Sequence, residues 1–153
     1  MNKKNQGVKI QILLAGAGEM EWVQRKVLDY CAQNDVDCNY LGFCKPRDVY
    51  GIADLAVLSS LYEGFSISSI EALAMGCPVV RSDSPGYTDM KEIVRVCRKN
   101  DLESLIEHLE YAVTHRDEMQ QMAIRGREEV QNRFTKEVTC DETFRVYQKI
   151  LGE

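Results

Sequence analysis

Short apolar segments alternate with amphipathic ones along the first hundred residues of the chain. The apolar segments are rich in β-branched residues, which predicts strands at residues 8–15, 39–43, 55–59, 78–82 and 93–97. Within residues 19–34, apolar side chains recur at helical spacing, which predicts a helix between the first two strands. The pattern is therefore one of strand followed by helix, repeated.

Helix signals complete this pattern. A helix predicted over 68–75 is stopped by Gly76 and followed by Pro78, and Pro46 opens a short helix. After Asp101 the chain is predicted to be helical to its end, and Thr135 can cap the last helix. Alternating strands and helices predict a Rossmann-like α/β fold, a parallel sheet with helices on both faces, in a single domain over residues 1–153.

Composition narrows the class of protein. Hydrophobic residues make up 44 % of the chain and charged residues 28 %, and the net charge of −5 argues against a nucleic-acid surface. No apolar run reaches the length that a transmembrane segment needs. The six cysteines form no Cys-x-x-Cys pair and the two histidines lie far from them, so we expect reduced thiols, a cytoplasmic protein and no metal site.

The candidate site lies where the strand at 55–59 leads into the helix at 68–75. Free backbone N–H groups at a helix start can hold an anion, and here they belong to Phe65, Ser66 and Ile67. Gly64 would let a ligand approach the backbone, and Ser66 can cap the helix. The plain alternative is a capped core helix beside a surface carboxylate.

Two carboxylates bracket this junction. Glu63 precedes the helix and Glu71 lies within it, eight positions later. Carboxylates beside an anion site are costly unless the ligand also carries hydroxyl groups, as a nucleotide sugar does. Upstream, Gly16 begins a tight turn after the first strand. Because Glu21 stands where a dinucleotide fingerprint needs a small residue, this turn is predicted either to line a nucleotide site or to be purely structural.

The order of motifs is more specific than any one of them. Three segments carry it: Leu41-Gly42-Phe43, then residues 53–66 ending in Glu63-Gly64-Phe65-Ser66, then residues 70–80 running from Ile70-Glu71-Ala72-Leu73-Ala74 to Gly76-Cys77-Pro78-Val79-Val80. This order resembles the C-terminal, donor-binding domain of retaining GT-B glycosyltransferases of the group 1 or family 4 type. The paired glutamates resemble the E-x7-E motif of that family, and the likeness runs from about Val8 to Leu151.

The resemblance implies a role for each matching position. Glu63 would be catalytic, in contact with the transferred sugar, and Glu71 would bind the ribose hydroxyls. The N–H groups of Phe65, Ser66 and Ile67, with Gly64, would hold the diphosphate or sugar. Gly16, Gly42 and Phe43 would lie near the nucleotide. The implied donor is a nucleotide-diphosphate sugar, transferred with retention, and no cofactor or metal is implied.

The resemblance also implies parts that precede Val8. In the family the domain begins with another strand and helix, which carry a basic clamp for the diphosphate, and an N-terminal domain binds the acceptor. Only Met1–Gly7 precede the first recognisable strand, and Lys3, Lys4 and Lys9 do not match the clamp. We therefore expect this domain to work with an N-terminal acceptor domain or a partner chain, in an enzyme that is cytoplasmic or peripheral to the membrane.

Two other functions stay open on the sequence. A nucleotide-sugar-binding module without transfer activity would use the same site and would differ only in lacking turnover. A sugar-nucleotide epimerase with a similar fold would need an acid or base in the cleft, and no histidine lies near either glutamate in the sequence.

Overall fold

The computed structural model describes residues 8–152, and the chain divides into two compact units. We call Met1–Val49 the N-terminal unit and Tyr50–Glu153 the C-terminal unit. The single domain predicted over residues 1–153 stays a prediction. Lys3 and Lys4, which do not match the position of the basic clamp in the sequence, lie outside the described residues.

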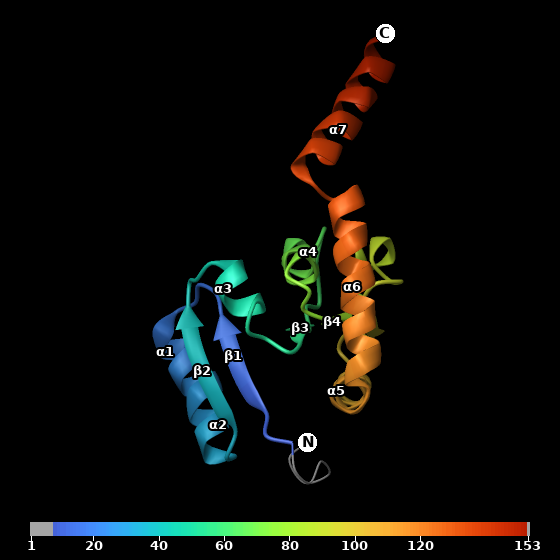
Figure 1. The fold of residues 1–153 in the computed structure, drawn as a ribbon. Helices are drawn as coiled ribbons and strands as arrows, with labels where there is room; N and C mark the ends of the chain where they lie inside the picture. The colour runs from blue at the N-terminus through green and yellow to red at the C-terminus, as the bar shows by residue number, and fades with distance from the viewer. Residues whose placement is uncertain (1–7, 153) are drawn as a thin grey trace. The chain divides into compact units, whose positions relative to one another are not determined.

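The N-terminal unit is a parallel strand pair with one helical stretch. Strand β1 (Gln11–Ala15) pairs with β2 (Asp37–Gly42), from Gln11 opposite Asp37 to Ala15 opposite Gly42. Between the strands run α1 (Met20–Val23), the π-helical segment η1 (Gln24–Leu28) and α2 (Asp29–Gln33) (Figure 1). The predicted strand–helix–strand order of this region is confirmed.

The core of this unit is thin. Among its described residues only Val23, Cys31 and Val49 are buried, and Ile12 of β1 is 41 % exposed. Helix α3 (Pro46–Tyr50), which Pro46 opens as predicted, reaches the boundary with the C-terminal unit.

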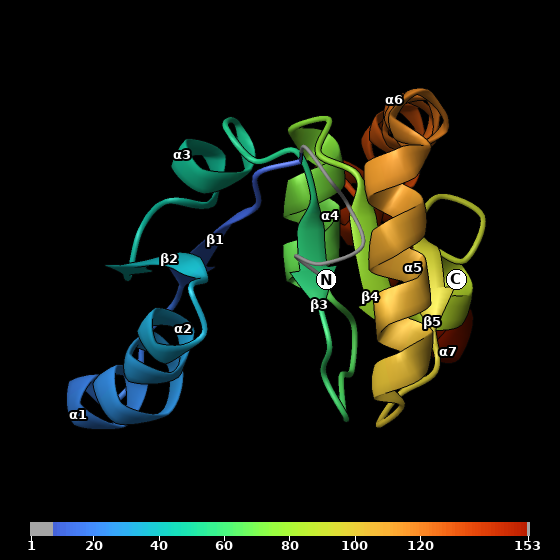
Figure 2. The ribbon, with the colours of Figure 1, turned by 90° about the horizontal axis from the view of Figure 1, so that it is seen from below.

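The C-terminal unit is a three-stranded parallel sheet with helices. The strands are β3 (Ala56–Leu58), β4 (Val79–Ser82) and β5 (Arg95–Cys97), in that order across the sheet. The helices are α4 (Ile67–Ala74), the 3-10 turn η2 (Tyr87–Asp89), α5 (Leu102–Thr114), α6 (Arg116–Arg133) and α7 (Lys136–Leu151) (Figure 2).

Successive residues of β4 show that both faces of this sheet are covered. Val79 packs in a cluster that includes Leu73 of α4 and Val130 of α6. Val80, which points to the other face, packs with Ala112 of α5 and Met119 of α6. This arrangement confirms the predicted α/β class with helices on both sides of a parallel sheet.

Gly126 brings α6 close to α4. A Cβ atom at Gly126 would lie 2.6 Å from Cδ2 of Leu73, so the absence of a side chain lets the two helices approach. Helix α7, by contrast, has no buried residue, and its apolar side chains Phe144, Tyr147 and Leu151 are exposed. None of the helices in the described part of the chain is both long and apolar enough to cross a bilayer.

All five predicted strands form, but the described residues arrange them in two sheets. Strands β1 and β2 make one, and β3, β4 and β5 make the other. The continuous sheet expected from the alternating pattern is therefore divided, because no hydrogen-bonded ladder joins β1 to β3.

Candidate functional site

Glu63 lies in the loop that follows β3, at the carboxyl end of the sheet. In an α/β sheet this is the end where ligands bind. The Glu63 side chain is half-buried, and its Oε1 atom accepts a hydrogen bond of 2.7 Å from the hydroxyl of Ser60. The carboxylate is therefore held from one side by its own loop, and it keeps further capacity to accept hydrogen bonds.

The start of α4 has the predicted cap. Ser66 is buried, and its hydroxyl accepts a hydrogen bond of 3.4 Å from the N–H of Ser69. The hydroxyls of Ser66 and Ser69 lie 2.9 Å apart. The N-cap role of Ser66 that the sequence suggested is confirmed, and the capped turn fixes the direction of the free N–H groups at the helix start.

The three predicted backbone donors differ in the structure. The N–H of Ile67 donates to the carbonyl of Phe65 at 3.0 Å. The N–H groups of Phe65 and Ser66 have no acceptor among the described residues. Two of the three predicted donors are thus available to a ligand as they stand, and Ile67 would have to exchange its partner. The assignment of all three to a bound diphosphate stays a prediction.

Glu71 lies inside α4 and is half-buried. Within the described residues its carboxylate takes part in no hydrogen bond or ion pair. A half-buried carboxylate without a protein partner is free to accept hydrogen bonds from ligand hydroxyls.

The loop after β4 packs directly on the segment that holds Glu63. Gly86 has a φ of +79°, and a Cβ atom there would lie 2.0 Å from the carbonyl oxygen of Gly64. Only glycine fits this position. Gly64 itself faces open space, since nothing lies within 4 Å of a Cβ placed on it. Sequence analysis missed Gly86, although its neighbour Pro85 marked the segment as a turn.

Phe65 contacts the C-terminal helices. Its ring centroid lies 5.5 Å from that of Phe134, and the guanidinium carbon of Arg133 lies 5.0 Å from the Phe134 ring centroid. An open cavity of about 560 Å³ adjoins this contact. It is lined by Phe65, Arg133, Phe134, Thr139, Glu142, Thr143, Arg145 and Val146. The sequence gave no signal that Phe65 and the last two helices would share a surface.

Gly16, Gly42 and Phe43 belong to the N-terminal unit. The N–H of Gly16 donates to the carbonyl of Gly42 at 2.9 Å, and the hydroxyl of Tyr40 donates to the carbonyl of Gly16 at 2.9 Å. Both glycines have positive φ, 139° and 63°. The structure thus brings the turns at Gly16 and Gly42 next to each other. The side chain of Phe43 is 91 % exposed. Their predicted contact with a nucleotide stays a prediction.

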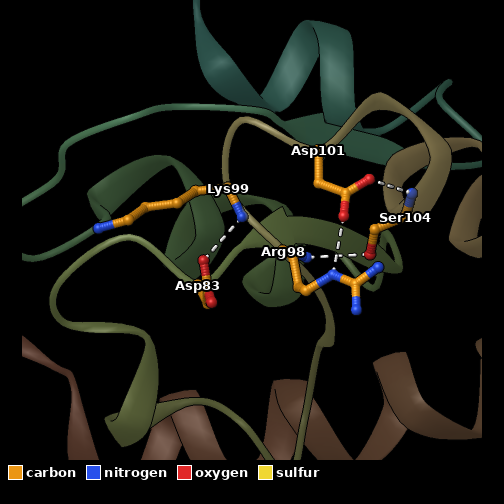
Figure 3. Close-up of polar contacts among 5 residues, drawn as sticks. All are labelled: Asp83, Arg98, Lys99, Asp101 and Ser104. Carbon is orange, nitrogen blue, oxygen red and sulfur yellow. Dashed lines mark hydrogen bonds and ion pairs between the residues drawn. The ribbon is translucent and has the colours of Figure 1, made fainter.

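The ends of β4 and β5 are joined by a polar network (Figure 3). Asp83 accepts a hydrogen bond of 2.7 Å from the N–H of Lys99. Asp101 caps α5 by accepting from the N–H of Ser104 at 2.9 Å, and it pairs with Arg98 at 2.8 Å. The Ser104 N–H, followed by the Arg98 side chain, lowers the pKa of Asp101. These groups hold the loops in place, so Asp83 has a structural role.

All six cysteines lie within the described residues and are free thiols. Burial raises the pKa of the Cys77 thiol to about 11, and burial also raises the pKa of Cys97. Both thiols are therefore protonated and inert near neutral pH.

Comparison with known proteins places this geometry in a family. The profile of the family described as "Glycosyl transferases group 1" matches residues 1–129. The chain belongs to this family. The structure agrees: its parallel sheets and flanking helices make it an α/β protein, consistent with half of a GT-B fold.

Individual relatives and solved structures align with nearly the whole chain. The capsular polysaccharide biosynthesis glycosyltransferase CapM of Staphylococcus aureus is 24 % identical over 97 % of this chain and 40 % of its own length. A glycosyltransferase structure from Rickettsia africae aligns with a TM-score of 0.84 at 19 % identity, over 95 % of this chain and 41 % of its own.

A structure of Anabaena Alr3699/HepE in complex with UDP aligns with a TM-score of 0.79 at 14 % identity, over 94 % of this chain and 41 % of its own. The chain spans between 21 % and 40 % of the length of the curated relatives it matches.

Sequence analysis singled out the start of α4 and both glutamates as candidate site residues. It missed Arg81, a buried cation in β4 whose only signal was a lone charge in an apolar run.

Proposed function

We propose that this chain is the donor-binding part of a retaining glycosyltransferase. It binds a nucleotide-diphosphate sugar, and with an N-terminal acceptor-binding domain or a partner chain it transfers the sugar with retention of configuration. The observation that carries this proposal is the capped start of α4. There, two backbone donors that have no acceptor within residues 8–152, at Phe65 and Ser66, lie between the half-buried carboxylates of Glu63 and Glu71 along the chain.

The chemistry of glycosyl transfer explains this combination of groups. The bond between the anomeric carbon and the diphosphate breaks, and a bond to an acceptor oxygen forms on the same face of the sugar. Negative charge grows on the diphosphate, and the N–H groups at the helix start would stabilise it. Positive charge grows on the sugar ring, and a carboxylate at Glu63 would stabilise that side. The acceptor proton leaves with the diphosphate.

Glu71 would accept hydrogen bonds from the ribose hydroxyls of the donor. Its carboxylate is half-buried and without a protein partner among the described residues, which suits that role. The proposed reaction uses no cofactor or metal, and we propose that it takes place in the cytoplasm. The complex of a structurally similar protein with UDP supports a uridine nucleotide as the first ligand to test.

Calorimetric titration of the protein with UDP, GDP, UDP-glucose and GDP-mannose tests the proposal. We expect saturable binding of one nucleotide series. Glu71→Gln should weaken binding of the nucleoside diphosphate about tenfold, because hydrogen bonds to a charged group are lost. Glu128→Gln, an exposed carboxylate on α6, is the matched control and should leave affinity unchanged.

Two results would contradict the assignment. Equal affinity of Glu71→Gln and the unchanged protein would remove Glu71 from the site. Failure of every nucleotide to bind would contradict donor binding as a whole. Chromatography that detects nucleoside diphosphate released from the nucleotide sugar distinguishes a transferase from a module that only binds.

A further inference from the structure

Arg81 is the largest fully buried side chain among the described residues, with 1 % of its surface exposed. It lies in β4, the middle strand of its sheet, opposite Leu58 of β3 and Val96 of β5. Arginine is almost never fully buried unless it is paired, and its guanidinium stays charged in proteins. A cation in this position therefore calls for a compensating group.

The direct partners of Arg81 are neutral. Its Nε atom donates to the carbonyl of Ser82, and its Nη2 atom donates to the hydroxyl of Ser84, both at 3.3 Å. The buried Nη1 atom has no hydrogen-bond partner within residues 8–152. None of the ion pairs formed by these residues includes Arg81. The positive charge is thus only partly satisfied by what touches it.

The carboxylate that acts on Arg81 is Glu63. Burial lowers the pKa of Arg81, and the negative charge of Glu63 opposes this effect. Hydrogen bonds and close hydroxyls link the two residues. Ser84 Oγ lies 3.3 Å from Ser82 Oγ, which donates to the carbonyl of Ser60 at 2.5 Å. The hydroxyl of Ser60 in turn donates to Glu63 at 2.7 Å.

We propose that Arg81 is a positioning residue for Glu63. It anchors the serine network that holds the loop and the carboxylate, and it supplies a buried positive charge behind that carboxylate. The inference rests on the proposed function, in which Glu63 contacts the sugar of the donor. It goes further because it assigns the orientation of Glu63 to Arg81 in β4, a buried residue that would not touch the ligand.

The proposal distinguishes the two halves of a donor. If Arg81 acts through Glu63, its loss weakens contacts to the sugar and leaves contacts to the nucleotide intact. A general loss of structure would weaken both. UDP and UDP-glucose are therefore the two probes, because they share the nucleotide and differ in the sugar.

The first experiment is a double-mutant cycle on the 153-residue protein. Arg81→Met should weaken UDP-glucose binding about tenfold and leave UDP binding within about twofold. Glu63→Gln should do the same, and the double variant should be no weaker than Glu63→Gln alone, because both changes remove one interaction. Arg98→Met, an exposed arginine of the same unit, is the control and should change neither affinity.

Several outcomes would overturn the proposal. Equal weakening of UDP and UDP-glucose by Arg81→Met would indicate a structural role. Fully additive losses in the double variant would show that the two residues act independently. If Arg81→Met does not fold, Arg81→Lys takes its place: it keeps the charge and loses the planar fork, so a smaller loss confined to UDP-glucose is expected.

The second experiment does not depend on ligand. The Nε–H group of a buried arginine gives a slowly exchanging NMR signal, which the Arg81 variants assign. Glu63→Gln should shift this signal and speed its exchange, and Glu128→Gln should not. An unchanged signal in Glu63→Gln overturns the proposal. If none of the four nucleotide ligands binds the unchanged protein, the proposed function fails, and this signal still decides whether the two residues are coupled.

Discussion

Strands β1 and β4 are both short, and each pairs in parallel with a neighbour in its own sheet. They differ in how deeply their side chains are buried. The sequence of β1, Gln-Ile-Leu-Leu-Ala, is more apolar than that of β4, Val-Val-Arg-Ser. Nevertheless all four residues of β4 are buried, including Arg81, and none of the five residues of β1 is. Burial therefore does not follow from the apolar content of a strand.

Neighbours explain the difference. Strand β4 has a hydrogen-bonded strand on each side, and helices pack on both of its faces. Strand β1 has one paired neighbour within the described residues. Parallel strands are stable when both edges and both faces are covered. We conclude that the C-terminal unit, which carries Glu63 and Glu71, is the more firmly packed of the two.

Truncating one leucine in each unit is the strongest way to break this comparison. Leu73 of α4 has no exposed surface, so Leu73→Ala should lower the free energy of unfolding of its unit by about 2–5 kcal/mol. Leu14 of β1 is half-buried, and Leu14→Ala should cost about 1 kcal/mol. Hydrogen exchange measured segment by segment in urea reports each unit separately. Equal losses in the two units would contradict the comparison.

Two glycines give a smaller contrast. Gly86→Ala must place a Cβ on the carbonyl of Gly64 and hold a positive φ, so it should cost about 3 kcal/mol and weaken UDP-glucose binding. Gly42→Ala in the N-terminal unit has a positive φ but open space, and it should cost about 1 kcal/mol. Chemical unfolding monitored by hydrogen exchange measures the stability of both glycine variants. A Gly86→Ala protein as stable as Gly42→Ala would show that the loop after β4 is not held against Gly64.

The pH dependence gives the smallest contrast. Both histidines lie in the C-terminal unit, and burial, followed by the charge of Arg95, lowers the pKa of His108 below its usual 6.5. The unfolded chain then binds a proton more readily than the folded one. The stability of the C-terminal unit should therefore fall as the pH drops below about 6.5.

His108→Asn should reduce this fall, and the N-terminal unit should show no histidine-dependent step. Thermal unfolding between pH 5 and 8, monitored by segment-resolved hydrogen exchange, measures the stability of each unit at each pH. An identical pH profile in His108→Asn would exclude His108 as the cause. Burial is the main cause of the lowered pKa of His108, and Arg95 adds to it, since Nη2 of Arg95 lies 3.1 Å from Nδ1 of His108.

Much of the fold could be predicted because its signals are local. Alternating apolar segments located all five strands, and the pattern of Ser66, Gly76 and Pro78 marked the start and end of α4. Glu63 and Glu71 could be recognised because their spacing and their neighbours lie within one stretch of sequence. Such features need only the residues that form them.

The parts that escaped prediction depend on contacts between distant segments. Nothing near Gly86 in the sequence shows that it packs on Gly64, and nothing near Arg81 shows that it is linked to Glu63. The exposure of β1 likewise depends on which strands lie beside it, and an apolar run does not reveal that. The sequence therefore located the candidate site but not the residues that support it.

The central claim is that a nucleotide-diphosphate sugar binds at the start of α4. An amide-resolved NMR titration of the protein with UDP-glucose tests it most directly. The account predicts saturable shifts, centred on the amides of Phe65 and Ser66, that Glu71→Gln weakens. Saturable binding that leaves these two amides unperturbed, or no binding by UDP-glucose or any other nucleotide sugar, would contradict it.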